Sequence, residues 1–178
     1  MLEDLRLINR LKKGKTDALE QIYNKYEKDV FRLAINLLGD PNSAEDVLQD
    51  VFMKFIESID RFRLTGSLRS YLAKCAVNRA RDYRRRAKVR STQSEVPPTT
   101  ESDDTRPLQK IMDKEQQEQI SLALAKLPYE QREVVVLHLQ ANQTFRQVAK
   151  LQNLPAKTVE SRYRYGLNRL QSILDNQV

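Results

Sequence analysis

Apolar residues recur at intervals of three and four along most of this chain, and that spacing is compatible with few folds other than a helical one. Only four glycines and six prolines are available for turns among the 178 residues. Stretches of β-branched residues that alternate with polar ones are also few, so β-hairpins have little to build on. The sequence therefore predicts an all-α protein.

Turn and cap signals divide the first part of the chain into helices. Thr16 can cap a helix that Gly39 ends, and apolar residues at helical spacing resume over residues 44–59. Ser67 is well placed as the N-cap of a third helix. We therefore expect residues 1–90 to form a compact helical domain.

The composition changes abruptly after this segment. Residues 91–110 contain almost no large apolar side chain and three prolines, so they bury too little surface to offset the entropy cost of ordering. This stretch is predicted to be a linker, with a second helical domain at 111–178. Two small helical domains with two separate cores are the expected architecture.

The second domain contains the pattern of a helix-turn-helix motif. Thr144 and Gln147 have the spacing of a capping box, and Asn153 to Pro155 form a turn before a helix that begins near Ala156. Two packed helices joined by a turn are common in all-α proteins, so the pattern alone favours DNA binding without requiring it.

Positive charge is concentrated between Ser67 and Arg90. These residues include nine lysines or arginines and the single acid Asp82, a net charge of +8, whereas the whole chain carries +7. Apolar residues recur at helical spacing within the same stretch, so one face of the helix belongs to a core and the cations form a folded surface. Such a surface favours a polyanionic partner.

Few residues could support catalysis or metal binding. The chain has one histidine, His138, and one cysteine, Cys75, and no glycine-rich phosphate loop or nucleophile–histidine–acid set. We therefore expect no enzyme activity, no catalytic residue, no metal and no cofactor. Cys75 is expected to be a buried, inert thiol, and His138 is either a packed side chain or a pH switch.

The longest apolar runs, such as that from Val134 to Leu137, are far too short to span a membrane. The first residues are too charged for a signal peptide. A cytoplasmic protein without membrane insertion is expected.

Taken together in their order and spacing, five segments resemble the sigma-70 family of bacterial transcription initiation factors, and within it the small extracytoplasmic-function (ECF) group. They are AEDVLQDVFMKF (44–55), IDRFR (59–63), SLRSYLAKCAVNRARDYRRR (67–86), LPYEQREVVVLH (127–138) and TFRQVAKLQNLPAKTVESRYRYGLNRL (144–170).

The resemblance implies a factor that binds RNA polymerase core and directs promoter-specific initiation. Its partners would be the β′ coiled coil, the β flap, double- and single-stranded promoter DNA, and an anti-sigma factor. The first domain would dock on polymerase and recognise and melt the minus-10 element, and the second would read the minus-35 element. The alternative is a stand-alone helix-turn-helix regulator.

The resemblance also assigns residues. The minus-10 surface would comprise a base-receiving loop, Asn78 on the following helix and phosphate-binding arginines: Phe62, Arg63, Thr65, Ser67, Arg69, Tyr71, Asn78, Arg79, Arg81, Arg84, Arg85 and Arg86. Tyr71 is equally compatible with a stacking ring and a core residue.

Two further sets are assigned in the same way. The minus-35 surface would comprise Arg146, Lys157, Thr158, Ser161, Arg162, Arg164, Tyr165, Asn168 and Arg169. Polymerase docking would fall to Asp46, Gln49 and Asp50, because carboxylates beside a DNA surface would repel phosphates and suit a cationic protein partner. For both sets the alternative is an ordinary solvated face.

Overall fold

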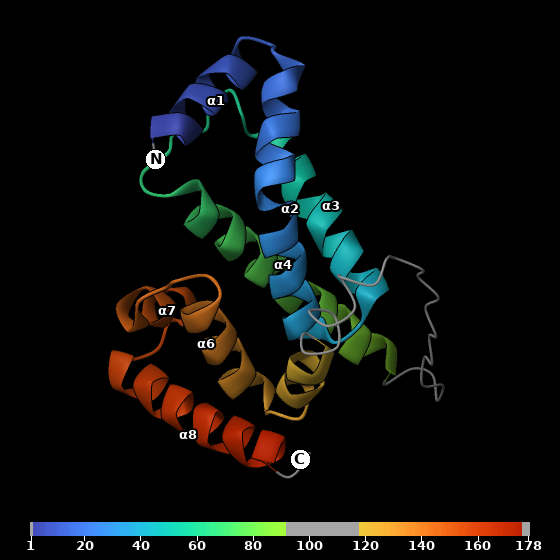
Figure 1. Ribbon diagram of the computed structural model, residues 1–178, viewed down its shortest axis with the longest axis vertical. Helices are drawn as coiled ribbons and strands as arrows, with labels where there is room; N and C mark the ends of the chain where they lie inside the picture. Colours follow the sequence, from blue (N-terminus) through green and yellow to red (C-terminus); the bar gives the residue numbers. More distant parts are fainter. Residues whose placement is uncertain (1, 92–117, 176–178) are drawn as a thin grey trace.

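The computed structural model describes residues 2–91 and 118–175, and within these ranges every regular element is a helix (Figure 1). The predicted all-α class is confirmed. The labelled helices are α1 (Leu2–Lys12), α2 (Thr16–Leu38), α3 (Pro41–Glu57), α4 (Leu68–Ser91), α6 (Tyr129–Leu139), α7 (Phe145–Gln152) and α8 (Ala156–Asp175). A further short helix spans residues 118–125.

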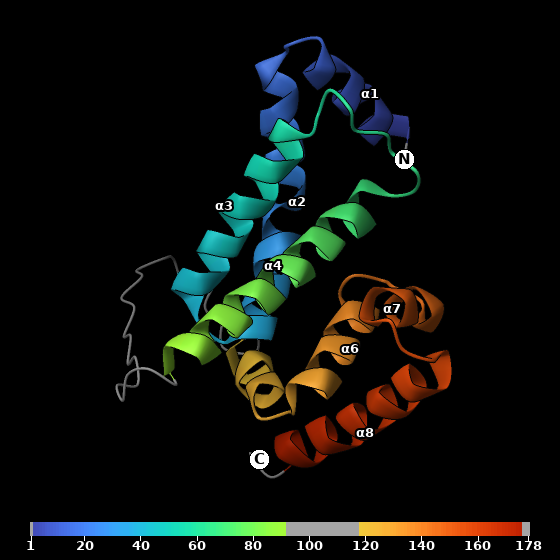
Figure 2. The same ribbon diagram turned by 180° about the vertical axis from the view of Figure 1, so that it is seen from behind.

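Helices α1 to α4 form a first helical unit. The long helix α2 packs against both α3 and α4, and α1 crosses the beginning of α2 (Figures 1 and 2). Ile22, Val51, Phe55 and Leu72 are fully buried where the three long helices meet. Each such side chain contributes about 1.5–3 kcal/mol by leaving water.

The junction between α2 and α3 follows the turn chemistry expected at Gly39. This glycine has φ 75°, and its amide donates to the Ile35 carbonyl (2.7 Å). Asp40 then caps α3 by accepting a hydrogen bond from the Ser43 amide (2.9 Å), and Pro41 is the first helical residue. The two helices can therefore fold back on each other without an intervening loop.

The predicted cap at Thr16 is wrong. Thr16 is the first residue of α2, and Lys15 occupies the cap position without a side-chain hydrogen bond. The tight turn after α1 explains this, because the Lys15 amide already donates to the Arg10 carbonyl (3.1 Å) and Gly14 adopts φ 76°. The turn therefore places Lys15, and not Thr16, at the cap position of α2.

The short helix at 118–125 and helices α6 to α8 form a second helical unit. The helix-turn-helix prediction is confirmed in detail: Thr144 and Gln147 form the reciprocal capping box of α7, and Asn153 has φ 54° in the turn that leads to α8. Gly166 permits close contact between α8 and α6, since a Cβ atom there would lie 2.9 Å from Val135 Cγ2. No helix among the described residues is long and apolar enough to cross a membrane.

The two units pack against each other, and their apolar residues form one continuous cluster where two separate cores were expected. The end of α2 lies beside the 118–125 helix and α6: Ser121 Oγ donates to Asn36 Oδ1 (2.6 Å), and Arg132 Nη1 donates to the Leu37 carbonyl (3.0 Å). The cause lies in residues 134–137, four consecutive buried apolar residues. At 100° per residue they surround α6, so one neighbouring face cannot bury them all.

A buried polar contact attaches α1 to α2. Asp4 is 4% exposed and accepts hydrogen bonds from Lys25 Nζ (2.9 Å) and Tyr26 OH (2.9 Å). Burial alone would raise the pKa of Asp4, but the hydrogen bonds from Lys25 and Tyr26 outweigh it and leave the pKa lowered. Burial and the bond to Asp4 raise the pKa of Tyr26 to about 12.

Replacement of this carboxylate should reduce stability in a pH-dependent way. We expect Asp4→Asn to lower the free energy of unfolding at neutral pH by about 1–3 kcal/mol, because a buried charged acceptor is lost. A carboxyl with a lowered folded-state pKa stabilises above its unfolded pKa of about 3.9, and this contribution is lost as the pH falls. Urea titrations should therefore show the two proteins converging at acid pH. Asp17→Asn, which removes an exposed pair with Arg10, should cost under about 1 kcal/mol. An equal effect of both substitutions would contradict the assignment.

Candidate nucleic-acid interface

Helix α4 carries the basic surface. Leu68, Leu72, Ala76 and Ala80 are buried on its inner side. Its start is fixed as the sequence predicts, since the Ser70 amide donates to Ser67 Oγ (3.1 Å). The lysines and arginines on the other sides of α4 therefore lie on a rigid surface.

The segment between α3 and α4 is held by aromatic packing. Phe62 makes an edge-to-face contact with Phe55 (centroids 5.2 Å apart) and lies 4.7 Å from the Tyr71 ring. Phe62 and Tyr71 are half-buried. Tyr71 is therefore packed against the core side of this segment rather than standing free as a stacking platform.

A lysine from α1 also holds this segment. Lys12 Nζ donates to the Phe62 carbonyl (2.6 Å) and lies 3.5 Å from the Asp60 carbonyl. Sequence analysis missed this residue, because nothing in the local pattern around Lys12 connects it with a loop fifty residues away. The contact fixes the backbone of the loop, while the side chains of Arg63 and Thr65 remain exposed.

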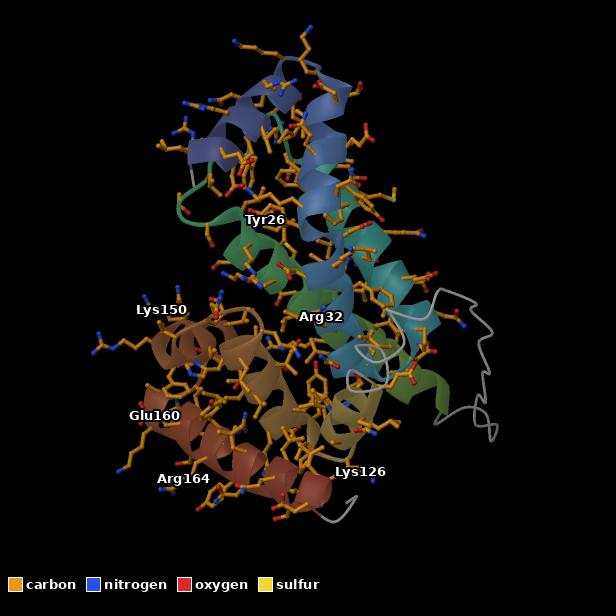
Figure 3. All side chains as sticks on the ribbon, in the orientation of Figure 1. Tyr26, Arg32, Lys126, Lys150, Glu160 and Arg164 are labelled. Atoms are coloured by element: carbon orange, nitrogen blue, oxygen red, sulfur yellow. The ribbon has the colours of Figure 1, made fainter. Side chains whose placement is uncertain are left out.

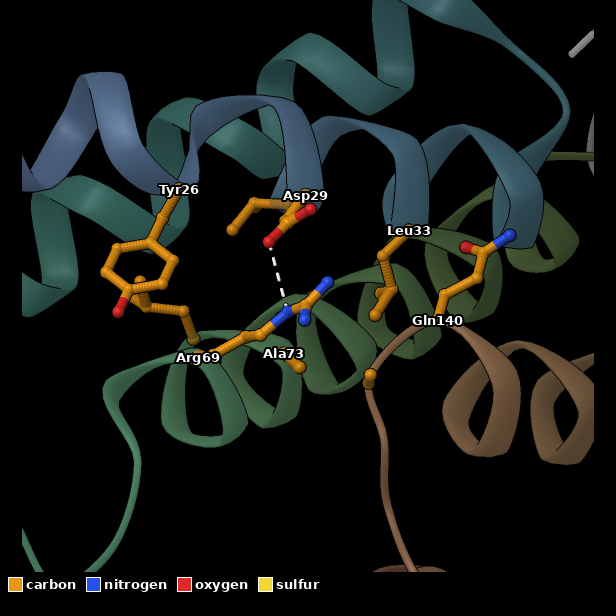
Figure 4. Close-up of a pocket in the computed structure, with 9 residues that line it drawn as sticks. Tyr26, Asp29, Leu33, Arg69, Ala73 and Gln140 are labelled. Carbon is orange, nitrogen blue, oxygen red and sulfur yellow. Dashed lines mark ion pairs between the residues drawn. The ribbon is translucent and has the colours of Figure 1, made fainter. Parts of the chain in front are cut away.

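Apart from the packed Phe62 and Tyr71, the predicted minus-10 residues fall into two groups. One group is exposed to solvent and consists of Arg63, Thr65, Ser67, Asn78, Arg84, Arg85 and Arg86, of which Arg85 also pairs with Asp82 of the same helix (Nη2 to Oδ1, 3.1 Å). The other is engaged in ion pairs: Arg69 Nε lies 3.0 Å from Asp29 Oδ2 (Figure 4), and Arg79 Nε lies 3.4 Å from Asp50 Oδ2. Arg81 also belongs to this second group.

Arg81 binds the second helical unit through three of its nitrogens. Nε donates to Glu133 Oε2 (3.1 Å), Nη2 donates to Glu133 Oε1, and Nη1 donates to the Leu151 carbonyl (3.2 Å). Glu133 is only 3% exposed and also accepts from Gln152 Nε2 (3.1 Å). Burial alone would lower the pKa of Arg81, but the bonds to Glu133 raise it, so the guanidinium stays charged.

Sequence analysis missed Glu133 as well. Its position directly before the apolar run 134–137, on the side of α6 that also carries Leu137, is the signal that could have identified it. The neighbouring Arg84 guanidinium lies 3.9 Å from the centre of the Tyr129 ring, also in the second unit. Burial raises the pKa of Tyr129.

The predicted docking residues lie on α3 next to the basic helix. Tyr83 OH donates to Asp46 Oδ2 (2.8 Å), Asp50 pairs with Arg79, and Gln49 is exposed. Gln49 also lines a groove between α2 and α3 that sequence analysis did not predict. This groove is formed by Thr16, Leu19, Glu20, Tyr23, Gln49, Phe52, Met53 and Ile56.

The predicted minus-35 residues lie on the outer side of the second unit. Lys157, Arg164, Tyr165, Asn168 and Arg169 of α8 are exposed, as is Arg146 of α7, whereas Thr158, Ser161 and Arg162 are half-buried. Figure 3 shows Arg164 on the side of α8 that faces away from α2 and α4. Arg162 differs from the others, because its Nη1 points back to Gln152 Oε1 (3.4 Å).

His138 and Cys75, the single histidine and the single cysteine of the chain, have packing roles. His138 stacks on Phe145 (4.3 Å), meets the edge of Tyr163 (4.7 Å), and places Nδ1 2.8 Å from the Gln143 carbonyl oxygen. Cys75 is half-buried, and burial raises its pKa, which disfavours the reactive thiolate. No group of histidine, cysteine and acidic residues in the described ranges could hold a metal ion.

These features define a class: a two-part helical protein with a helix-turn-helix and a separate basic helix, both suited to nucleic acid. Comparison with known families gives the assignment. Residues 22–90 match the model for sigma-70 region 2, and residues 117–170 match the model for sigma-70 region 4. The chain belongs to the sigma-70 family, in its ECF group, and directs transcription initiation from promoters.

Individual proteins and solved structures that the chain resembles are also sigma factors. The ECF RNA polymerase sigma factor SigW of Bacillus subtilis is 26% identical over 176 residues, which is 94% of each chain. SigM of Mycobacterium tuberculosis is 27% identical, over 90% of this chain and 79% of that protein. Among solved structures, RpoE from Bartonella quintana, in complex with the anti-sigma factor NepR, has a TM-score of 0.70 at 24% identity and covers 88% of this chain and 96% of its own. CnrH, in complex with the cytosolic domain of CnrY, has a TM-score of 0.68 at 21% identity and 99% coverage of both chains.

The contact of Lys12 with the loop can be tested directly. We expect Lys12→Gln to increase hydrogen exchange at the amides of residues 60–66 without a large change in global stability, because only an exposed anchor of the loop backbone is lost. Hydrogen exchange followed by mass spectrometry would measure this. Lys13→Gln, an exposed neighbour, serves as the control, and equal exchange in both variants would rule out the anchoring role.

Proposed function

We propose that the first helical unit, within residues 1–90, docks on RNA polymerase core and opens the minus-10 element, and that the second unit, within residues 111–178, reads the minus-35 element. The observation that carries this proposal is the position of α4, a rigid basic helix directly behind an exposed loop. The predicted linker boundary near residue 110 lies outside the described residues.

Strand opening would proceed by capture of an unstacked base. The loop from Phe62 and the exposed Asn78 would receive the base, while Arg84, Arg85 and Arg86 contact the phosphates on either side. Capture of a base in such sites is worth about 1–3 kcal/mol. Because only the open strand offers this base, binding shifts the equilibrium toward the open state.

Polymerase docking would use α3. Asp46, Gln49 and Asp50 offer carboxylate and amide groups to the cationic side of the β′ coiled coil. The groove beside them adds an apolar component, since Met53 is 58% exposed and lies next to Phe52 and Ile56. Exposed apolar side chains next to a polar docking surface are typical of protein interfaces.

Upstream duplex recognition would use the outer side of α8. Lys157, Arg164 and Tyr165 can reach base edges in the major groove, and Arg146 and Arg169 can neutralise phosphates. Arg162 is the exception among the predicted residues, because its bond to Gln152 serves the interior of the motif.

Three further assignments follow from membership of the family. The apolar side of residues 120–138 would receive the β flap. The sigma factors RpoE and CnrH were solved with NepR and CnrY, and we infer a comparable anti-sigma partner for this chain. It would act in the cytoplasm as a non-enzymatic subunit, with polymerase supplying the chemistry.

The proposed function can be tested by reconstitution. Purified chain together with polymerase core from the same organism should produce transcripts from discrete start sites on its genomic DNA, and each component alone should not. The mapped start sites would also reveal both promoter elements. Absence of core binding in a pull-down would contradict the proposal, and tight duplex binding without polymerase would favour the stand-alone regulator.

Charge reversal on α3 tests the docking surface. We expect Asp50→Lys to weaken core binding about tenfold or more, because a cation replaces the carboxylate that meets the coiled coil. Fluorescence titration with core would measure the affinity. Asp17→Lys makes the same charge change at an exposed position of α2, outside the predicted set, and should have little effect. Equal affinities for both variants would remove Asp50 from the docking surface.

Truncation on α8 tests duplex reading. Arg164→Ala should reduce holoenzyme affinity for the upstream duplex by about 1–3 kcal/mol if Arg164 reads a base, or lower the salt slope by about one if it contacts a phosphate. Lys150→Ala on α7, an exposed cation outside the predicted set, is the matched control. If Arg164→Ala changes neither quantity, Arg164 belongs to the solvated surface.

A further inference from the structure

One exposed carboxylate lies among the cations at the beginning of α8. Glu160 comes three residues after Lys157 and four before Arg164, and all three side chains are exposed. Residues at these spacings are neighbours on a helix, so Glu160 borders the predicted minus-35 surface (Figure 3). The sequence-based assignment of that surface leaves it out.

The usual structural roles of a surface carboxylate do not account for Glu160. A carboxylate in the first turn of a helix stabilises the helix dipole, but Glu160 is the fifth residue of α8, and no acid occupies the first turn. A glutamate four residues before an arginine can also form an ion pair along the helix. Arg164 Cζ instead lies 5.4 Å from the centre of the Tyr165 ring. The carboxylate of Glu160 has no ion pair or hydrogen bond among the described residues.

A carboxylate in this position carries a cost when α8 enters a major groove. The phosphates of both strands lie along the groove walls, so an unpaired carboxylate between them is repelled and also loses part of its hydration. The cost is offset where the carboxylate accepts a hydrogen bond from a base edge on the groove floor. An unpaired glutamate beside the reading surface therefore requires a base that donates a hydrogen bond.

The chemistry of the base edges limits which base this is. The hydrogen-bond donors that the major groove presents are the amino groups of cytosine (N4) and adenine (N6), whereas guanine and thymine present the acceptors O6 and O4. Adenine also carries the acceptor N7 beside its amino group, and that atom repels a carboxylate. Cytosine presents a donor without a neighbouring acceptor, so it is the base that suits Glu160 best.

We propose that Glu160 is a specificity-determining residue of α8, which accepts a hydrogen bond from a cytosine amino group in the minus-35 element and disfavours guanine and thymine at that position. The cations beside it attract DNA of any sequence, whereas the carboxylate penalises every sequence that leaves it without a donor. Base reading by Glu160 rests on the proposed role of α8 and names one base and one side chain within it.

The neighbouring cations select a different base. Arginine and lysine in a major groove donate to guanine O6 and N7. Four residues separate Glu160 from Arg164, about 6 Å along the helix axis, so we expect the two side chains to reach different base pairs. Any base preference that depends on Arg164 therefore belongs to a position other than that of the cytosine.

A base-substitution series tests the role of Glu160. Glu160→Gln and the parent chain, each bound to polymerase core, are titrated with promoters that carry all four bases in turn at every position of the upstream element. The parent should favour cytosine over guanine and thymine at one position by about fivefold or more. Glutamine keeps the length of the side chain but can also donate, so the variant should lose most of this preference and keep the others. Its affinity for promoters without the cytosine should rise, because no carboxylate is left unpaired.

Asp175→Asn is the matched control. It neutralises an exposed acid at the other end of α8 and should leave every preference unchanged. Thermal melts should show both variants to be as stable as the parent, because both side chains are exposed. A Glu160→Gln variant with the preferences of the parent would overturn the proposal. A uniform rise in its affinity for all promoters, with the preferences intact, would also overturn it by showing only general repulsion of phosphates.

The same titrations separate the role of Glu160 from the proposed function. A parent holoenzyme without any base preference in the upstream duplex would contradict the reading role of α8, and the assignment of Glu160 with it. A parent with clear preferences that Glu160→Gln leaves unchanged would contradict the assignment of Glu160 alone.

Discussion

The contact between Arg81 and Glu133 joins the two helical units beside the buried apolar run 134–137. It joins α4, the most basic helix of the chain, to α6, and it reaches the helix-turn-helix through Leu151 and Gln152. Glu133 is one of the few charged side chains buried in the described residues. A carboxylate in that position is tolerated because a guanidinium from another element meets it in a bidentate geometry.

Helix α4 has to satisfy several requirements at once. Its inner side completes the core with α2 and α3, and its outer side carries the cations proposed to hold DNA. Between these sides, Arg79 and Tyr83 contact Asp50 and Asp46 of the proposed polymerase-docking surface. The proposed docking and DNA-binding surfaces therefore include side chains that touch each other.

Local rules were sufficient to predict α2, α3 and α4, the turn at Gly39, the caps at Ser67 and Thr144 and the helix-turn-helix, because each depends on neighbours within a few residues. Helix α1 was not predicted. The two separate cores were not a correct prediction, since the all-round apolar run 134–137 needs cover from more than one side. Lys12 and Glu133 were missed because their partners lie about fifty residues away and no local spacing records such pairs. The family resemblance supplied the proposed roles of Asn78 and Arg164, which the described structure leaves exposed and which remain predictions.

In the described structure the two units pack as one body, with Arg81 of α4 bound to Glu133 of α6. Pulsed dipolar spectroscopy measures this arrangement directly, with spin labels at Lys28→Cys and Gln171→Cys, two exposed positions in different units, in a Cys75→Ser background. One narrow distance distribution is predicted for the free protein. A broad distribution, as expected for two units that move independently, would contradict the arrangement.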